Sequence, residues 1–247
     1  ELGQYPVVSV RRDEGTDEIY GRAELYTCIP RRVTEALFDE VYASVLMSAT
    51  LRPFDVAADV LGLDDPVTMA YGLEYPEERR RTYAAGTPAL FASDRGDPDV
   101  QESVSGLVSD LAAFTPGNTL LFFPSYAEAE RYHQRLGGGS GRPVGEANGG
   151  DADLVLDSSD ADTEALRERF VDSDNAALFT SLWGTLAEGV SFDSDDARTV
   201  AVVGVPYPHI DDRLEAVQNA YDRAYSDRQN AGWRYAVEIP TVRKTRQ

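Results

Sequence analysis

The alternation of apolar and helical segments in the second half of the chain limits the folds available to it. Between residues 101 and 225, short runs of Leu, Val, Phe and Ala alternate with segments whose apolar residues recur at helical spacing. Strands that alternate with helices favour a parallel, doubly wound α/β sheet with helices on both faces. We expect strands at 119–123, 154–156, 176–180 and 199–205, and helices at 101–114, 125–136, 163–171 and 211–225.

The first half of the chain has a weaker pattern, and residues 64–98 are rich in Pro, Gly and charge. We expect strands at 7–10 and 23–29, helices at 31–41 and 54–61, and a short buried strand at 43–48. Gly62 is placed to end the second of these helices. We therefore divide the chain into a leading segment, 1–42, and one α/β domain, 43–247.

Residues 137–150 contain seven glycines in fourteen positions. A Gly-rich segment can cradle a phosphate, but that role needs a helix directly after it and usually a Lys. Neither follows here, so we predict a flexible loop at 137–150.

Acidic residues outnumber basic ones by 43 to 23, which gives a net charge of −20. Lys244 is the only lysine. Strongly apolar segments lie between the acidic ones, which argues against a disordered chain. We interpret the composition as an acidic, Lys-poor surface adapted to a salt-rich cytosol, where ions screen the self-repulsion. Under such screening the net charge does not exclude a nucleic-acid partner.

The single cysteine excludes an intrachain disulfide and an all-cysteine metal site within this sequence. Cys28 lies on an alternating segment, where a small buried hydrophobic residue is expected. His133 and His209 have no ligand-like spacing around them, so we expect no metal site. No apolar run approaches the length of a membrane span, and we expect a cytoplasmic protein without a membrane partner.

Three polar segments follow predicted strands, where ligands of parallel sheets gather. Ser48-Ala49-Thr50 ends the run at 43–48 and can exchange hydrogen bonds with a neighbouring domain; hydroxyls bonded within a strand end are the alternative. Ser125 precedes a helix with Glu128 three residues later, a capping box whose exposed amides can hold a backbone phosphate. A plain helix cap is the alternative.

The third polar segment, 180–192, begins with Thr180-Ser181 as the chain leaves a strand. Trp183-Gly184 allows a sharp turn, and Glu188-Gly189 precedes a short apolar return. The Trp183 indole can stack on a base. The alternative is a tryptophan at the mouth of the core.

Four segments, in their order and separation, resemble motifs III, IV and V of the XPD/DinG family of superfamily 2 DNA helicases. They are Leu46–Leu51, Phe122–Tyr126, Ala187–Phe192 and Val203–Pro208. The resemblance implies the second RecA-like motor domain of a helicase. It implies DNA contacts at Ser125, Tyr126, Thr180, Ser181 and Trp183, nucleotide contacts at Glu188, Gly189 and Ser191, and coupling between the two sites at Ser48, Ala49 and Thr50. Ser191 stands where many members carry Asp, which puts a contact made by that Asp in doubt.

The resemblance also implies ATP and Mg²⁺ as cofactors, a first motor domain as partner, and 5′-to-3′ movement on single-stranded DNA. The sequence has no Gly-x4-Gly-Lys-Ser/Thr loop, no Asp-Glu-x-His and no set of four cysteines for the iron–sulfur cluster of XPD-type proteins. We expect these before Glu1, and an arginine finger in motif VI, which would begin at Gln247. The chain is then a piece of a motor, with no catalytic residues of its own and inactive by itself.

Two other classes of protein are alternatives to a helicase motor domain. A complete α/β enzyme on a Rossmann-like sheet would need a dinucleotide fingerprint after its first strand, and none is found. An acidic interaction module without chemistry fits the charge but leaves the ordered series of motifs as coincidence.

The stability of the chain should depend on salt. Lowering the salt from 1 M to 0.1 M lengthens the Debye distance from about 3 Å to about 10 Å, so that carboxylates repel one another over a longer range. The melting temperature should therefore fall when scans by circular dichroism go from molar to 0.05 M potassium chloride. A melting temperature that does not change over this range would contradict the interpretation of a salt-adapted surface.

Overall fold

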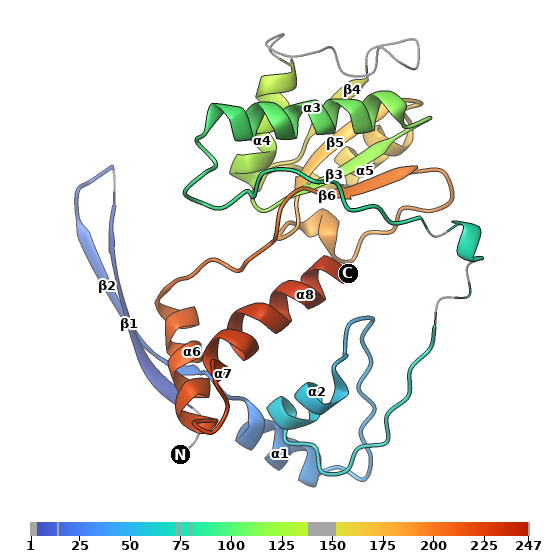
Figure 1. Cartoon of the computed structure of the whole chain (residues 1–247). Helices are drawn as coiled ribbons and strands as arrows, with labels where there is room; N and C mark the ends of the chain where they lie inside the picture. The colour runs from blue at the N-terminus through green and yellow to red at the C-terminus, as the bar shows by residue number, and fades with distance from the viewer. Residues whose placement is uncertain are drawn as a thin grey trace. The chain divides into compact units, whose positions relative to one another are not determined.

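A computed structural model describes residues 4–13, 15–72, 74, 76–79, 81–137 and 152–246 (Figure 1). The chain divides into two compact units. Unit 1 comprises Glu1–Pro76 and Tyr207–Arg246, and unit 2 comprises Glu77–Pro206. Apart from Gly137, the loop predicted at 137–150 lies outside the described residues.

Unit 2 is built on a four-stranded parallel sheet in the order β4-β5-β3-β6. Its strands are β3 (Thr119–Phe123), β4 (Asp153–Leu156), β5 (Ala176–Ser181) and β6 (Thr199–Val202). Its helices are α3 (Pro98–Phe114), α4 (Tyr126–Gly137) and α5 (Thr163–Val171), with 3₁₀ turns η1 (Glu77–Arg79) and η3 (Thr185–Ala187). The predicted parallel α/β sheet is confirmed, although β6 ends three residues earlier than expected.

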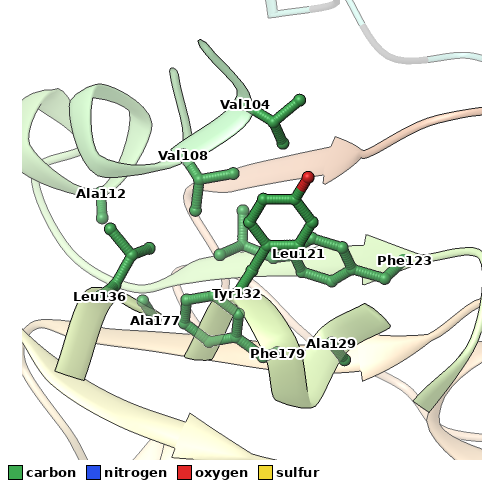
Figure 2. Close-up of a cluster of buried hydrophobic side chains, with 10 residues drawn as sticks. All are labelled: Val104, Val108, Ala112, Leu121, Phe123, Ala129, Tyr132, Leu136, Ala177 and Phe179. Carbon is green, nitrogen blue, oxygen red and sulfur yellow. The ribbon is translucent and has the colours of Figure 1, made fainter. Parts of the chain in front are cut away.

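The two faces of this sheet carry separate hydrophobic clusters. On one face Leu121 and Phe123 of β3 pack with side chains of α3 and α4, and Phe123 stacks on Tyr132 at 5.3 Å between ring centroids (Figure 2). The intervening residues of β3, Leu120 and Phe122, belong to the other cluster, which includes Phe170 of α5. Successive strand residues point to opposite faces, so both faces of a buried strand need an apolar cover.

Unit 1 contains an antiparallel hairpin of β1 (Gln4–Arg12) and β2 (Ile19–Thr27), in which Gln4 pairs with Thr27. Its helical segments are α1 (Arg31–Asp39), α2 (Phe54–Leu61), α6 (Asp212–Ala224), α7 (Ala231–Trp233), the π-helical η4 (Arg234–Glu238) and α8 (Ile239–Arg246). Gly62 ends α2 in the left-handed region, at φ 68°, as predicted. Cys28 is also buried as predicted.

The division into units does not follow the predicted boundary at residue 43. Arg213 of α6 forms an ion pair with Glu24 of β2, and the Arg228 Nη1 lies 2.8 Å from Asp59 Oδ2 of α2. Contacts of this kind join residues more than 160 positions apart, and no local pattern in the sequence reveals them. They gather 207–246 with the leading segment in unit 1.

The predicted buried strand at 43–48 is wrong. These residues form no ladder with any described strand, and the side chains of Val45 and Met47 are 83% and 87% exposed. An apolar run favours a strand, but the strand forms only where a neighbouring strand supplies hydrogen-bond partners. In the described part of unit 1, β1 and β2 pair only with each other.

Asn118 should be critical for the stability of unit 2. Its buried Nδ2 donates to the Phe170 oxygen at 2.8 Å and to the Asp196 oxygen at 3.2 Å, and its Oδ1 accepts from the Ala176 nitrogen at 2.8 Å. Asn118→Ala leaves these backbone groups without their partner, so the free energy of unfolding should fall by roughly 2–4 kcal/mol. Urea unfolding at constant high salt measures it.

The matched control is Asn219→Ala on the exposed face of α6. It should change the free energy of unfolding by no more than about 0.5 kcal/mol. Equal effects of the two substitutions would show that the Asn118 hydrogen bonds contribute little.

Candidate functional site

The loops that carry the motifs of unit 2 meet at one edge of its sheet. All four strands run parallel, so their carboxyl ends share this edge. Backbone hydrogen bonds continue beyond the strands, from the Leu182 nitrogen to the Phe123 oxygen at 2.9 Å and from the Val203 nitrogen to the Phe122 oxygen at 2.8 Å. The predicted placement of the loops after β3, β5 and β6 on a common edge is confirmed.

Ser125 caps the N-terminus of α4, because its Oγ accepts a hydrogen bond from the Glu128 nitrogen at 3.2 Å. The reciprocal half of the predicted capping box is not formed. The buried Glu128 carboxylate instead accepts from Arg131 Nη1 at 2.7 Å. The helix terminus therefore has one side-chain cap, with the helix dipole directed at the same point.

Tyr126, the first residue of α4, is half-buried. Its hydroxyl lies near the Asp157 side chain and the Thr185 backbone. Burial, reinforced by the nearby Asp157 charge, raises the pKa of the phenol. A Cβ added to Gly184 would lie 2.3 Å from the phenol oxygen, so only glycine at 184 allows this approach.

Asp157 is buried at the carboxyl end of β4, with 3% of its surface exposed. Its Oδ2 accepts a hydrogen bond from Thr180 Oγ1 at 2.6 Å. Burial raises the pKa of this carboxyl, while donors from Thr180, Ser158 and Tyr126 partly oppose the shift. Asp157 is not among the predicted site residues, although an acidic residue directly after the apolar run 154–156 was a usable signal.

Thr180 and Ser181 are buried, at 0% and 1% exposure. Thr180 is bonded to Asp157, and Ser181 Oγ accepts from the Trp183 nitrogen at 3.1 Å. These two hydroxyls thus have internal partners, and their contact with DNA stays a prediction. Trp183 differs from them, because its side chain is 45% exposed.

Glu188, Gly189 and Ser191 lie on an exposed segment after η3. Gly189 has φ +82°, a conformation that other residues adopt only with strain. The predicted nucleotide-facing residues are therefore accessible to a ligand, and they follow the turn that packs on Tyr126.

Ser48, Ala49 and Thr50 belong to unit 1, whereas the carboxyl edge belongs to unit 2. The Ser48 Oγ accepts from the Thr50 nitrogen at 3.2 Å. Arg243 of α8 donates to the carbonyl oxygens of Leu51 and Arg52, each at 3.3 Å. The structure does not bring the predicted coupling residues together with the loops of unit 2 in one compact unit.

The described residues contain no group of three or more His, Cys, Asp or Glu side chains that could hold a metal ion. In the same part of the chain, none of the helices has the length and apolar character needed to cross a membrane.

A family model described as the helicase C-terminal domain matches residues 108–247. The chain belongs to this family. The match covers β3, α4, β5 and the carboxyl edge described above. The predicted resemblance to XPD/DinG helicases and the RecA-like α/β fold are thereby confirmed. An interaction module without a motor fold is not favoured.

Curated relatives carry the same resemblance over most of the chain. The general transcription and DNA repair factor IIH helicase subunit XPD/RAD3 of Saccharomyces cerevisiae is 21% identical over 204 residues, 76% of this chain and 25% of that protein. The XPD subunit of Schizosaccharomyces pombe is 22% identical over 222 residues, 82% of this chain and 28% of that protein. This chain therefore spans about a quarter of the length of these relatives.

A solved structure of an XPD helicase matches with a TM-score of 0.62 and 21% identity, over 91% of this chain and 39% of that one. At this level of identity the match supports the fold.

The raised pKa of Asp157 should be visible in the pH dependence of the free energy of unfolding. Its folded-state pKa lies above the ordinary value of 3.8, so the folded chain binds more protons than the unfolded chain as pH rises above 3.8. Because of this group, the free energy of unfolding falls as pH rises from the unfolded-state pKa to the folded-state pKa. Above the folded-state pKa the contribution of the group no longer changes. Asp157→Asn removes that loss. In urea unfolding between pH 3.5 and 8, the stability of the original chain relative to the variant should fall as pH rises.

The control is Asp174→Asn, the same substitution at an exposed aspartate. Parallel profiles for the original chain and Asp157→Asn would contradict the assignment.

Proposed function

We propose that this helicase C-terminal domain is the second motor domain of an ATP-dependent DNA helicase of XPD/DinG type, moving 5′-to-3′ on single-stranded DNA. The family match over residues 108–247 carries the proposal. Relatives named as DNA repair helicase subunits and ATP-dependent DNA helicases support it. The parallel sheet supports it further, because the motif loops gather at the edge where such sheets bind ligands.

On the nucleotide side, the exposed segment with Glu188, Gly189 and Ser191 would face ATP and Mg²⁺ held between this domain and a first motor domain. The printed sequence lacks a Gly-x4-Gly-Lys loop, and its only lysine is Lys244. Phosphoryl transfer depends on positioned charge around the phosphates. The chain by itself should therefore not hydrolyse ATP.

On the DNA side, the capped N-terminus of α4 at Ser125 offers helix amides to a backbone phosphate. Trp183 offers an exposed aromatic face to a base. Thr180 and Ser181 would act on DNA through the shape of the loops, because their hydroxyls have internal partners. Tyr126 would act through its packing on Gly184.

The net charge of −20 opposes binding to phosphates at low salt. We propose that the protein works in concentrated salt, where screening removes most of this repulsion. Binding then depends on short-range contacts with helix amides, arginines and aromatic rings.

The test uses the native protein that carries this sequence, purified in molar salt. Single-stranded DNA should stimulate its ATP hydrolysis, whereas the 247-residue chain alone should show none. Trp183→Ala should weaken binding of an oligothymidine by roughly 5- to 150-fold, the value of one stacked base. Fluorescence anisotropy measures this affinity.

The control is Trp233→Ala, because Trp233 is 44% exposed, close to the 45% of Trp183, but lies in unit 1. It should leave the DNA affinity unchanged. A native protein without DNA-stimulated ATP hydrolysis, or ATP turnover by the chain alone, would refute the proposed function.

A further inference from the structure

The outer edge of β2, in the hairpin of unit 1, is open to a further strand (Figure 1). In the part of the chain that the structure describes, β1 and β2 pair only with each other. A two-stranded hairpin is marginally stable in water, and an open edge is a template for pairing with another chain. β2 contains no proline or lysine, the residues that commonly protect such an edge.

The register of the hairpin determines which backbone groups of β2 point outward. The Asp13 nitrogen donates to the Glu18 oxygen at 2.9 Å, directly beyond the ladder pair of Arg12 with Ile19. Hydrogen-bonded and non-hydrogen-bonded pairs alternate along an antiparallel ladder. Every second residue of β2 therefore directs its N–H and C=O away from β1. These residues are Ile19, Gly21, Ala23, Leu25 and Thr27.

The outer edge of β1 is less suited to pairing. Pro6 lies opposite Leu25 in the ladder, so the same alternation places it among the outward-directed positions of β1. Proline has no N–H and interrupts the row of donors on that edge. The helix α6 also contacts β1. A further strand is therefore expected at β2.

The charges of β2 are complementary to those of a second copy of the same strand. Ala23 is the central one of its nine residues, so two copies can pair antiparallel over their whole length with Ala23 opposite itself. Arg22 of each copy then lies opposite Glu24 of the other. The Arg22 side chain is 66% exposed, and its Nη2 lies 2.7 Å from Glu24 Oε2 in its own strand. Across the new edge these charges would alternate in sign, which stabilises a strand pair.

The uncharged side chains fit the same register. Tyr20 of each copy lies opposite Tyr26 of the other, and aromatic pairs across strands are favourable. Leu25, which is 73% exposed, lies opposite Gly21, where no side chain competes for the space. Pairing therefore removes apolar surface from water as well as satisfying the open backbone groups.

We propose that β2 is a self-association surface, on which a second copy of this chain pairs antiparallel about a two-fold axis at Ala23. The two hairpins then form one continuous sheet, with β2 of each copy at its centre. The same patch of both copies makes the contact, so the assembly closes as a dimer. This inference goes beyond the proposed function and does not depend on it.

Arg22→Glu in the native protein tests the charge pairing. The substitution places like charges opposite each other twice in the dimer, so the dissociation constant should rise by roughly 5- to 30-fold. Sedimentation equilibrium in molar salt measures it. The matched control is Arg12→Glu on β1, because the Arg12 side chain is 65% exposed and carries the same charge. This control should leave the dissociation constant within about twofold of the original.

Mixing two variants tests the register. Glu24→Arg alone also places like charges opposite each other, so neither it nor Arg22→Glu should form the original dimer efficiently. In a mixed dimer, Glu at position 22 lies opposite Arg at position 24, and the other pair is the original one. The equimolar mixture should therefore recover the dimer that each variant loses.

Ala23→Pro tests the backbone pairing without changing charge. It removes an outward N–H at the centre of the proposed interface, where proline is compatible with an edge strand. The dimer should be lost. The matched control is Val8→Pro, at the residue that pairs with Ala23 on β1, and it should keep the dimer. Circular dichroism and urea unfolding show whether each variant is folded; if Glu24→Arg is not, Ala23→Pro decides.

The outcomes are separate from those of the proposed function, which DNA-stimulated ATP hydrolysis tests. A native protein that is monomeric in sedimentation overturns the inference. So does a dimer that persists in folded Arg22→Glu and Ala23→Pro. Folded variants that stay monomeric when mixed, although the original protein is a dimer, overturn the antiparallel register and the inference with it.

Discussion

The pairing of β3 with β5 on one side and β6 on the other determines the geometry of the candidate site. Parallel pairing brings the carboxyl ends of the strands to one edge, and each loop that leaves this edge starts from a hydrogen-bonded backbone. Both faces of β3 are covered, by α3 and α4 on one side and by the cluster around Phe170 on the other. The loops are therefore carried by the most deeply buried part of unit 2.

Buried polar side chains form hydrogen bonds at both ends of this sheet. Asn118 precedes β3 and joins the starts of β3 and β5 to the loop before β6. Asp157 follows β4 and is joined to β5 by the hydrogen bond from Thr180. Polar groups in the interior are costly unless each has a partner, so these two residues define a specific arrangement of loops as well as adding stability. The net charge of −20, by contrast, resides mainly on a surface where salt decides its effect.

Unit 1 shows where local preference fails. The run 43–48 is as apolar as a buried strand, yet it has no ladder partner among the described residues. No helix was predicted over α7, η4 and α8, a segment that contains Pro240. Proline has no N–H to donate, and Pro240 closely follows the π-helical η4, where the regular i→i−4 hydrogen bonding of the helix is already interrupted. The ion pair of Arg213 with Glu24 likewise joins segments that no local pattern connects.

The amino-acid pattern alone predicted the α/β class, the bounds of β3, α2 and α5, the Ser125 cap and the helicase family. Each depends on periodicity or on residues close together in the chain, which local physics can reveal. The fold was needed to show that Thr180 and Ser181 are buried, that Asp157 takes part in the site, and that the Tyr126 hydroxyl lies against Gly184 in the loop after β5. Burial and hydrogen-bond partners depend on residues brought together from separate strands. A single sequence shows which side chains can make such contacts, and folding decides which of them do.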